Sequence, residues 1–157
     1  MNETPDPLGR GLRLDAGDLV VERPGGGAGA PTLGTLSGIE ALAQALTLAL
    51  ETQLGSDPVN VSFGFDLRAL GANPFSVRER REHLRLQLVR TVASDRRVRE
   101  IRELYFDDDP RFAELHPGTD LDRQRSRVSA SRRATATIEI ETIAGDRFTV
   151  RAGVPDA

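Results

Sequence analysis

The chain has 157 residues and a net charge of −3, and 38% of its residues are hydrophobic, which suits one domain with an aliphatic core. It contains no Cys, so disulfides, thiol catalysis and cysteine-based zinc sites are excluded. All 21 basic residues are Arg, which excludes a Walker A lysine and Schiff-base chemistry.

The start of the chain and its hydropathy bear on localisation. The first residues, MNETPDPLGRG, lack the basic-then-apolar order of a signal peptide. No apolar run approaches the roughly 20 residues that span a bilayer. We therefore expect assembly in the cytoplasm, without direct membrane insertion.

Charge is arranged in alternating blocks along the chain. Residues 77–102 hold nine Arg and four acidic residues, whereas residues 103–121 hold one Arg and six acidic residues. Residues 122–133 are again basic, with five Arg and one Asp. Such alternation favours protein–protein or self-complementary contacts over a uniform basic footprint for nucleic acid, so we expect no nucleic-acid partner.

Proline and glycine divide the N-terminal part of the chain. The segment RPGGGAGAPTLG contains five Gly and two Pro, a composition typical of a flexible linker. We expect an extended lead over residues 1–22, this linker over 23–34, a single α+β domain over 35–152 and a tail over 153–157.

Two helices are predicted next. Apolar residues recur at three- and four-residue steps from Leu36 to Leu54, with Ser37 and Glu40 as an S-x-x-E capping box and Gly55 as the stop. A second S-x-x-E, Ser76 with Glu79, opens a helix over residues 77–93. Its basic stripe is either a solvated face, paired with neighbouring glutamates, or a surface for a partner: Arg78, Arg81 and Arg85.

The C-terminal half favours strands. REIRELYF alternates like a strand, although a helix also fits its apolar spacing, and the charged residues 107–133 are expected to form a mobile excursion. ATATIEIETI, the turn AGD and RFTVRA predict a hairpin. The predicted fold is α+β: a small, mostly antiparallel sheet with two main helices packed on one face and a C-terminal β-hairpin.

Patterns for catalysis, cofactors and metals are weak. Gly25, Gly27 and Ala30 satisfy a loose G-x-G-x-x-A, but flanking prolines favour a linker. His83 and His116 lack metal-site spacing. A glycosidase needs two carboxyl groups beside a cleft usually lined with aromatic residues, and the chain has no Trp and one Tyr. We expect no catalytic, cofactor or metal site.

Several segments follow one another in a characteristic order over residues 8–152: PLGRGLRLDAGDLVV, a glycine-containing break, a Leu-rich helix ending ETQLGS, FGFDL, NPFS, LVRTVASDRRVREI and a terminal strand pair. This succession resembles the gene-25-type baseplate wedge family of contractile phage tails, type VI secretion systems and extracellular injection particles. That family is sometimes labelled lysozyme-like.

Two motifs of the family have counterparts in this chain. The family's F-G-x-x-L loop is matched by Phe63, Gly64 and Leu67, which together with Asp66 imply a structural turn before the second helix. An acid–Pro–Arg motif docks the helical core bundle of the wedge in the family. Here Asp95 and Arg97 take the outer positions, and Arg96 replaces the proline.

The resemblance implies a non-enzymatic baseplate component that joins wedge proteins to the first ring of a sheath, in several copies around a sixfold baseplate. The surface implied for the wedge core consists of Arg78, Arg81, Arg85, Asp95 and Arg97. The hairpin implied to contact the sheath protein by β-augmentation carries Ile138, Ile140, Phe148 and Val150.

Other interpretations stay open for these residues and for the function. Asp95 also fits a turn residue, Arg97 a surface arginine, and the hairpin an internally satisfied pair of strands. A muramidase is suggested by the family's lysozyme-like label, and a nucleic-acid-binding adaptor is a less favoured alternative.

Overall fold

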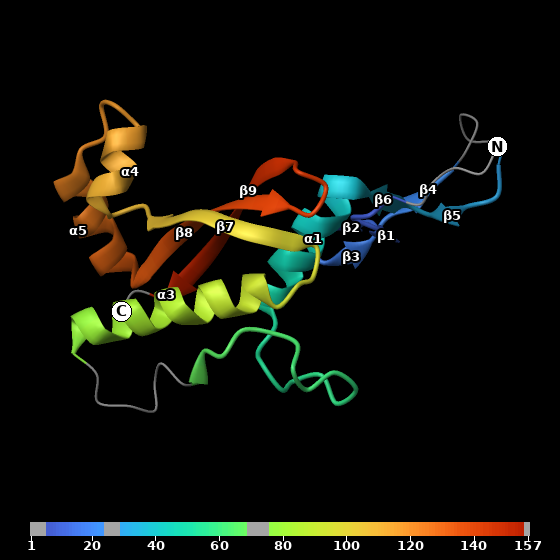
Figure 1. Cartoon of the computed structure of the whole chain (residues 1–157), viewed down its shortest axis with the longest axis horizontal. Helices are drawn as coiled ribbons and strands as arrows, with labels where there is room; N and C mark the ends of the chain where they lie inside the picture. Colours follow the sequence, from blue (N-terminus) through green and yellow to red (C-terminus); the bar gives the residue numbers. More distant parts are fainter. Residues whose placement is uncertain (1–5, 24–28, 69–75, 156–157) are drawn as a thin grey trace.

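The computed structural model describes residues 6–23, 29–68 and 76–155. Its centre is a three-stranded antiparallel sheet of β7 (Val98–Phe106), β8 (Arg133–Thr142) and β9 (Arg147–Pro155), in the order β7-β8-β9. The helices α1 (Gly38–Glu51) and α3 (Val77–Ala93) contact each other and pack on the sheet, as Figure 1 shows. The α+β prediction, with two helices and a C-terminal hairpin, is confirmed.

The core lies between the two helices and one face of the sheet. Alternate residues of β8 and β9 point into it, and the register places Ile138 opposite Val150 and Ile140 opposite Phe148. The helices contribute Leu42, Leu46 and Leu50 from α1, and Leu84, Leu88 and Val92 from α3. The three- and four-residue spacing of these side chains is what turns one stripe of each helix toward the sheet.

The two helix starts differ although both carry S-x-x-E. At α3 the capping box forms, because the Ser76 hydroxyl accepts from the Glu79 amide and the Glu79 carboxylate accepts from the Ser76 amide. At α1 the Ser37 side chain makes no cap hydrogen bond, so that prediction was wrong. Ser37 lies at the end of a short strand, where it pairs with Arg10, and the next amide, that of Gly38, donates to the Gly9 carbonyl at 3.1 Å.

The N-terminal segment forms a ribbon of short paired strands that projects from the body of the molecule (Figure 1). Its members are β1 (Arg10–Leu12), β2 (Leu14–Asp15), β3 (Asp18–Leu19), β4 (Val21–Glu22), β5 (Thr32–Leu33) and β6 (Thr35–Ser37). β1 pairs with β6, β2 with β3, and β4 with β5, all antiparallel. We call residues 10–22 and 32–37 the N-terminal ribbon. Residues 32–33 were expected to belong to the flexible linker, but they form β5. Residues 24–28 of the predicted linker lie outside the described part of the chain.

Residues 107–133, expected to be a mobile excursion, contain two helices, α4 (Pro110–Leu115) and α5 (Leu121–Ser131). Their starts carry local signals that the sequence analysis did not use: Pro110 at the first helical position and Asp120 as an N-cap that accepts from the Arg123 amide. Val128 of α5 is only 1% exposed and joins the core. α5 is therefore packed against the domain.

Within residues 6–23, 29–68 and 76–155, no helix is both long and apolar enough to cross a membrane.

Candidate functional site

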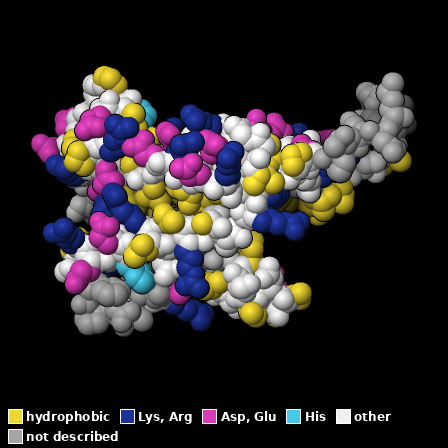
Figure 2. Space-filling model, in the orientation of Figure 1, with side chains coloured by type: hydrophobic (Ala, Val, Ile, Leu, Met, Phe, Trp, Pro, Cys, Tyr) yellow, Lys and Arg dark blue, Asp and Glu magenta, His cyan; other side chains and the backbone are white. Residues whose placement is uncertain are grey.

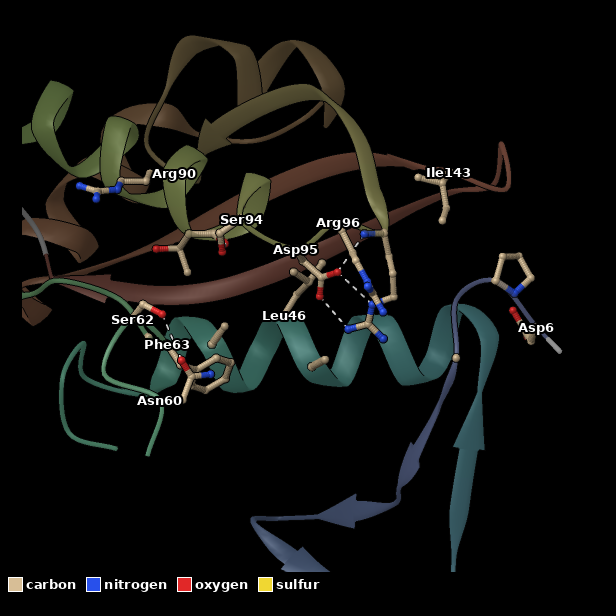
Figure 3. Close-up of a pocket in the computed structure, with 17 residues that line it drawn as sticks. Asp6, Leu46, Asn60, Ser62, Phe63, Arg90, Ser94, Asp95, Arg96 and Ile143 are labelled. Carbon is tan, nitrogen blue, oxygen red and sulfur yellow. Dashed lines mark hydrogen bonds and ion pairs between the residues drawn. The ribbon is translucent and has the colours of Figure 1, made fainter. Parts of the chain in front are cut away.

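A groove of about 1040 Å³ runs between α1, the turn from α3 to β7, the loop around residues 60–64 and the segment that leads into the N-terminal ribbon (Figure 3). Ala45, Leu46 and Ala49 of α1 line it, and the two alanines leave room because their side chains end at Cβ. Arg90 and Arg96 line it from α3 and the following turn, and both are exposed. The groove therefore combines a small, apolar wall with a basic rim.

Asp95 and Arg97 lie in this groove and bind each other. The Arg97 guanidinium donates to both Asp95 carboxylate oxygens, at 2.9 Å from Nε to Oδ1 and 2.6 Å from Nη2 to Oδ2. The Arg97 amide also donates to Asp95 Oδ1. About a fifth of each side chain is exposed, at 20% for Asp95 and 23% for Arg97. Such a two-pronged pair is among the stronger charge-assisted contacts in proteins.

The pair also holds the start of the described chain. Arg97 Nη1 donates to the Leu8 carbonyl at 2.9 Å, and the Leu8 side chain is only 2% exposed. We call the contact among Asp95, Arg97 and the Leu8 carbonyl the clasp. The Arg97 hydrogen bond lowers the pKa of Asp95, and Asp95 in turn raises the pKa of Arg97. The clasp is thus an internal contact, and the basic residues of the rim that are exposed to a ligand are Arg90 and Arg96.

The basic stripe of α3 divides into two environments. Arg81 Nη1 donates to Asp108 at 3.0 Å, and Arg85 Nη2 donates to Asp109 at 2.5 Å. Both guanidinium groups lie over the Phe106 ring, with Cζ at 4.4 Å and 5.2 Å from its centroid. Arg81 and Arg85 therefore fasten α3 to the start of α4.

Arg78 differs from the other two arginines of the predicted stripe because it is exposed and takes part in no ion pair within the described ranges. The wedge-facing set expected from the sequence is therefore spread over the groove, the α3–α4 contact and an exposed helix start. Sequence reasoning missed Asp108 and Asp109 as partners, although the opposite charges of residues 77–102 and 103–121 were a usable signal. It also missed the positions of Arg90 and Arg96 at the groove.

The loop predicted to be a structural turn passes next to the end of α1. Gly64 has φ of +115°, and a Cβ there would lie 2.6 Å from the Thr52 carbonyl oxygen. Phe65 donates from its amide to that same oxygen at 2.8 Å, and its ring is only 1% exposed. The anchor of the turn is thus Phe65, which the sequence analysis did not select.

The other residues of this predicted turn lie around that anchor. Phe63 and Asp66 are half-buried, and Leu67 is 38% exposed. Phe63 and Gly64 line the groove, whereas Leu67 does not. The turn therefore forms one wall of the groove.

The four hairpin residues expected to contact a sheath lie on the covered face of the sheet. Ile138, Ile140 and Val150 are at most 3% exposed, and Phe148 is half-buried against the same core. Their side chains therefore stabilise the domain. What the hairpin offers to a partner is the backbone edge of β9 and the side chains on its opposite face.

The backbone of β9 is free along one edge in the described part of the chain, because β9 ends the strand order and its ladder is with β8. The Thr142 amide donates to the Asp146 carbonyl at 2.9 Å. Since hydrogen-bonded pairs alternate along an antiparallel ladder, the even-numbered residues of β9 bond to β8. Odd-numbered residues, from Arg147 to Gly153, direct their N–H and C=O groups outward.

Metal binding has no evident centre in this fold: among the described residues no group of three or more His, Asp or Glu side chains is placed to hold an ion.

Comparisons with known proteins show a likeness at the level of fold. No protein-family model matches the chain, and no curated protein matches it. A solved structure from Geobacter sulfurreducens, provisionally named a tail lysozyme, aligns with a TM-score of 0.54 and 17% sequence identity. The alignment covers 78% of this chain and 95% of that chain. The two chains share a fold, and membership of the gene-25-type family stays a prediction.

The expectation of a non-enzymatic protein is contradicted by this comparison. The Geobacter sulfurreducens protein carries the name of a lysozyme, which is an enzyme. Our expectation depended on the family resemblance, on the scarcity of aromatic residues and on the absence of recognisable catalytic spacing. Carboxyl groups that act together in a glycosidase have no fixed spacing in sequence, because the fold brings them together. We therefore withdraw that expectation.

Proposed function

We propose that this protein is a component of a phage tail or a related contractile particle, where it joins baseplate wedge proteins to the first ring of the sheath. The observation that carries this proposal is the fold, which is shared with a protein provisionally named a tail lysozyme and leaves one edge of the C-terminal strand β9 open. Several copies around a sixfold baseplate, assembled in the cytoplasm, complete the proposal.

The open edge of β9 supports the sheath contact. Outward N–H and C=O groups from Arg147 to Gly153 accept an additional strand by backbone hydrogen bonding. The opposite edge, on β7, is less suitable because its register shifts twice, between Val98 and Glu100 and between Ile101 and Glu103. Such bulges protect an edge against pairing.

The groove supports the wedge contact. It has a volume of about 1040 Å³, and its rim carries Arg90 and Arg96 beside the clasp. The resemblance noted in the sequence places wedge docking at the same acid–x–Arg segment. In this chain, however, Asp95 and Arg97 shape the groove, and Arg90 and Arg96 are the side chains that meet the partner.

A proline at Thr149 tests the sheath contact. Thr149 directs its amide outward, so Thr149→Pro removes one donor from the open edge and no bond to β8. Thr149→Ala keeps the amide and is the matched control. We expect Thr149→Pro to stop the protein from nucleating sheath polymerisation in a reconstituted mixture, while Thr149→Ala nucleates like the wild type. Equal nucleation by both variants, with unchanged circular dichroism, would refute the assigned edge.

A charge reversal at Arg96 tests the wedge contact. Arg96→Glu changes the groove rim, whereas Arg78→Glu makes the same charge change at an exposed site outside the groove. We expect Arg96→Glu to reduce capture of wedge proteins about tenfold, which corresponds to about 1.4 kcal/mol, and Arg78→Glu to leave capture near the wild-type level. Equal losses for the two variants would show that the groove has no special part in docking.

Peptidoglycan cleavage is the second candidate function, and the name of the Geobacter sulfurreducens protein favours it. The groove contains two carboxyl groups, those of Asp6 and Asp95. The lowered pKa of Asp95 keeps it ionised, which suits a base or a charge-stabilising group better than a proton donor. Clearing of a peptidoglycan suspension by the wild type, lost in Asp6→Asn or Asp95→Asn, would establish this activity. No clearing by the wild type would remove it.

A further inference from the structure

The outer edge of β9 has a charge pattern as well as free backbone groups. Exposure alternates along the strand: Arg147, Thr149 and Arg151 are exposed, whereas Val150 and Ala152 are buried. We propose that the strand accepted at this edge carries acidic residues four positions apart, opposite Arg147 and Arg151, and apolar residues on its other face. This inference rests on the proposed function for the existence of a strand-donating partner, and adds the chemistry of the segment that partner donates.

The two arginines are available for such a strand. The Arg147 side chain is 71% exposed and touches Glu141 only through Nε, at 3.3 Å. Arg151 is exposed and takes part in no ion pair with any residue of the described ranges. Alternate residues of a strand lie about 6.7 Å apart, so side chains four residues apart stand about 13 Å apart on one face. An incoming strand in register therefore needs its acids at the same four-residue interval.

The inner neighbour of β9 shows what kind of strand fits. β8 places Glu141 opposite Arg147 and Thr137 opposite Arg151, with Glu139 opposite Thr149 between them. On the covered face it places Ile138 opposite Val150. A strand on the outer edge faces the same β9 side chains from the other side. It is therefore expected to resemble β8 in its alternation of acidic or hydroxyl residues with apolar ones.

The β7 edge does not offer an equivalent pattern. Its open-face residues include Glu100 and Glu103 beside Arg99 and Arg102, so charges of both signs alternate there. Arg102 is already bound to Glu141 and Glu100, and Glu103 to Arg111. With two register shifts in addition, β7 presents neither a regular ladder nor a uniform charge. The selectivity for acidic residues is thus confined to β9.

Synthetic peptides added to the full-length protein test the inference directly. The probe is TAEITVEAT, whose two acids are four residues apart on one face, and the control is TARITVRAT, identical except for charge. We expect the acidic peptide to bind at least about tenfold more tightly than the basic one, a difference that shrinks as salt is raised. Amide hydrogen exchange should slow at the odd-numbered residues of β9 and stay unchanged on β7.

Charge-reversed variants complete the test. Arg151→Glu should abolish the preference, because either peptide then meets one attractive and one repulsive charge, whereas Arg99→Glu, the same change on β7, should leave the preference intact. Equal binding of the two peptides by the wild type, or protection of β7 in place of β9, would overturn the inference. The inference would also be overturned if the wild type associated with itself, if Thr149→Pro abolished that association and if the wild type bound the two peptides equally. A second copy of the chain would then occupy the edge.

The outcome is separable from that of the proposed function. If the wild type nucleates sheath polymerisation but does not discriminate between the peptides, the proposed function stands and the charge selectivity falls. If the peptides are discriminated but no sheath protein is nucleated, the selectivity of β9 stands and the sheath assignment falls.

Discussion

The N-terminal ribbon and the C-terminal hairpin are both antiparallel strand pairs, but their burial is opposite. In the hairpin, the facing pair Ile138 and Val150 is 0% and 3% exposed. In the ribbon, the facing pair Val21 and Leu33 is 62% and 47% exposed. Figure 2 shows hydrophobic side chains on the projecting part of the molecule as well as in the body. Strand pairing alone therefore does not produce a core; a layer of helices over one face is needed.

Because the ribbon buries few apolar side chains, contacts with the body of the molecule must stabilise its position. A two-stranded ribbon is only marginally stable in water, because few of its side chains leave the solvent. The ribbon is held instead by hydrogen bonds to the body at residues 12–14, which we call the ribbon root. Gln44 of α1 donates to the Leu12 carbonyl at 2.7 Å and accepts from the Leu14 amide at 2.8 Å. The clasp holds the Leu8 carbonyl next to that root.

The largest effect on stability is expected in the hairpin. Ile138→Ala removes a fully buried side chain from the centre of β8, and we expect the free energy of unfolding to fall by about 2–5 kcal/mol. Leu33→Ala, in the exposed ribbon, should change it by less than about 0.5 kcal/mol. Urea denaturation followed by circular dichroism measures both. Comparable losses for the two variants would mean that the ribbon packs against something in the free protein.

Gly64→Ala is expected to have the next largest effect. The φ of +115° at Gly64 is unfavourable for alanine, and the added Cβ would lie 2.6 Å from the Thr52 carbonyl oxygen and 2.9 Å from the Leu54 amide nitrogen. Gly17→Ala is the control, because Gly17 has φ of +91° but no heavy atom within 4 Å of the added Cβ. Gly17→Ala should cost about 1–2 kcal/mol from backbone strain alone. A thermal or urea midpoint for Gly64→Ala no lower than that of Gly17→Ala would contradict the predicted clash.

Arg97→Ala tests how far the root of the ribbon depends on the body. The substitution removes the hydrogen bonds to Asp95 and to the Leu8 carbonyl, and we expect a loss of about 1–2 kcal/mol because the pair is partly exposed. The Gly38 amide, which donates to the Gly9 carbonyl, should exchange its hydrogen faster. Arg78→Ala is the control. Unchanged exchange at Gly38 would show that the ribbon root is held without the clasp.

The sequence was sufficient to predict contacts between residues that are close along the chain, and elements in which apolar side chains recur at a fixed spacing. Ser76 and Glu79 are three residues apart, and their capping box formed as predicted. The alternation in β8 and β9 predicted the hairpin, because period two places one row of side chains on one face. The clasp depends partly on the short spacing of Asp95 and Arg97, which allows the side chain of one to reach the other.

The sequence was insufficient where a contact joins distant segments. Ser37 and Glu40 have the spacing of a capping box, but Ser37 pairs with Arg10, 27 residues earlier, at the end of β6, and its side chain makes no cap hydrogen bond. Asp108 and Asp109 bind arginines of α3 that lie more than 20 residues earlier in the chain. In the sequence, only the opposite charges of the two blocks indicated this contact. For the same reason the groove, built from four separate segments, had no signature in the sequence.

The smallest expected effect is the pH dependence of the clasp. Because Arg97 lowers the pKa of folded Asp95, its ordinary unfolded value of about 3.9 lies above the folded one. The stabilisation is therefore complete above about pH 4 and is lost as the pH falls through the folded pKa, because the unfolded state binds the proton first.

The lowered pKa values of Glu79, Glu103 and Glu141 add a similar acid dependence, but it is common to wild type and Arg97→Ala. The difference in unfolding free energy between these two proteins should thus be constant above about pH 4 and narrow as the pH falls below that value, whereas the difference between wild type and Arg78→Ala should not change with pH. A difference for Arg97→Ala that is independent of pH would show that Arg97 stabilises the ribbon root through the Leu8 carbonyl alone, without a contribution from the charge of Asp95.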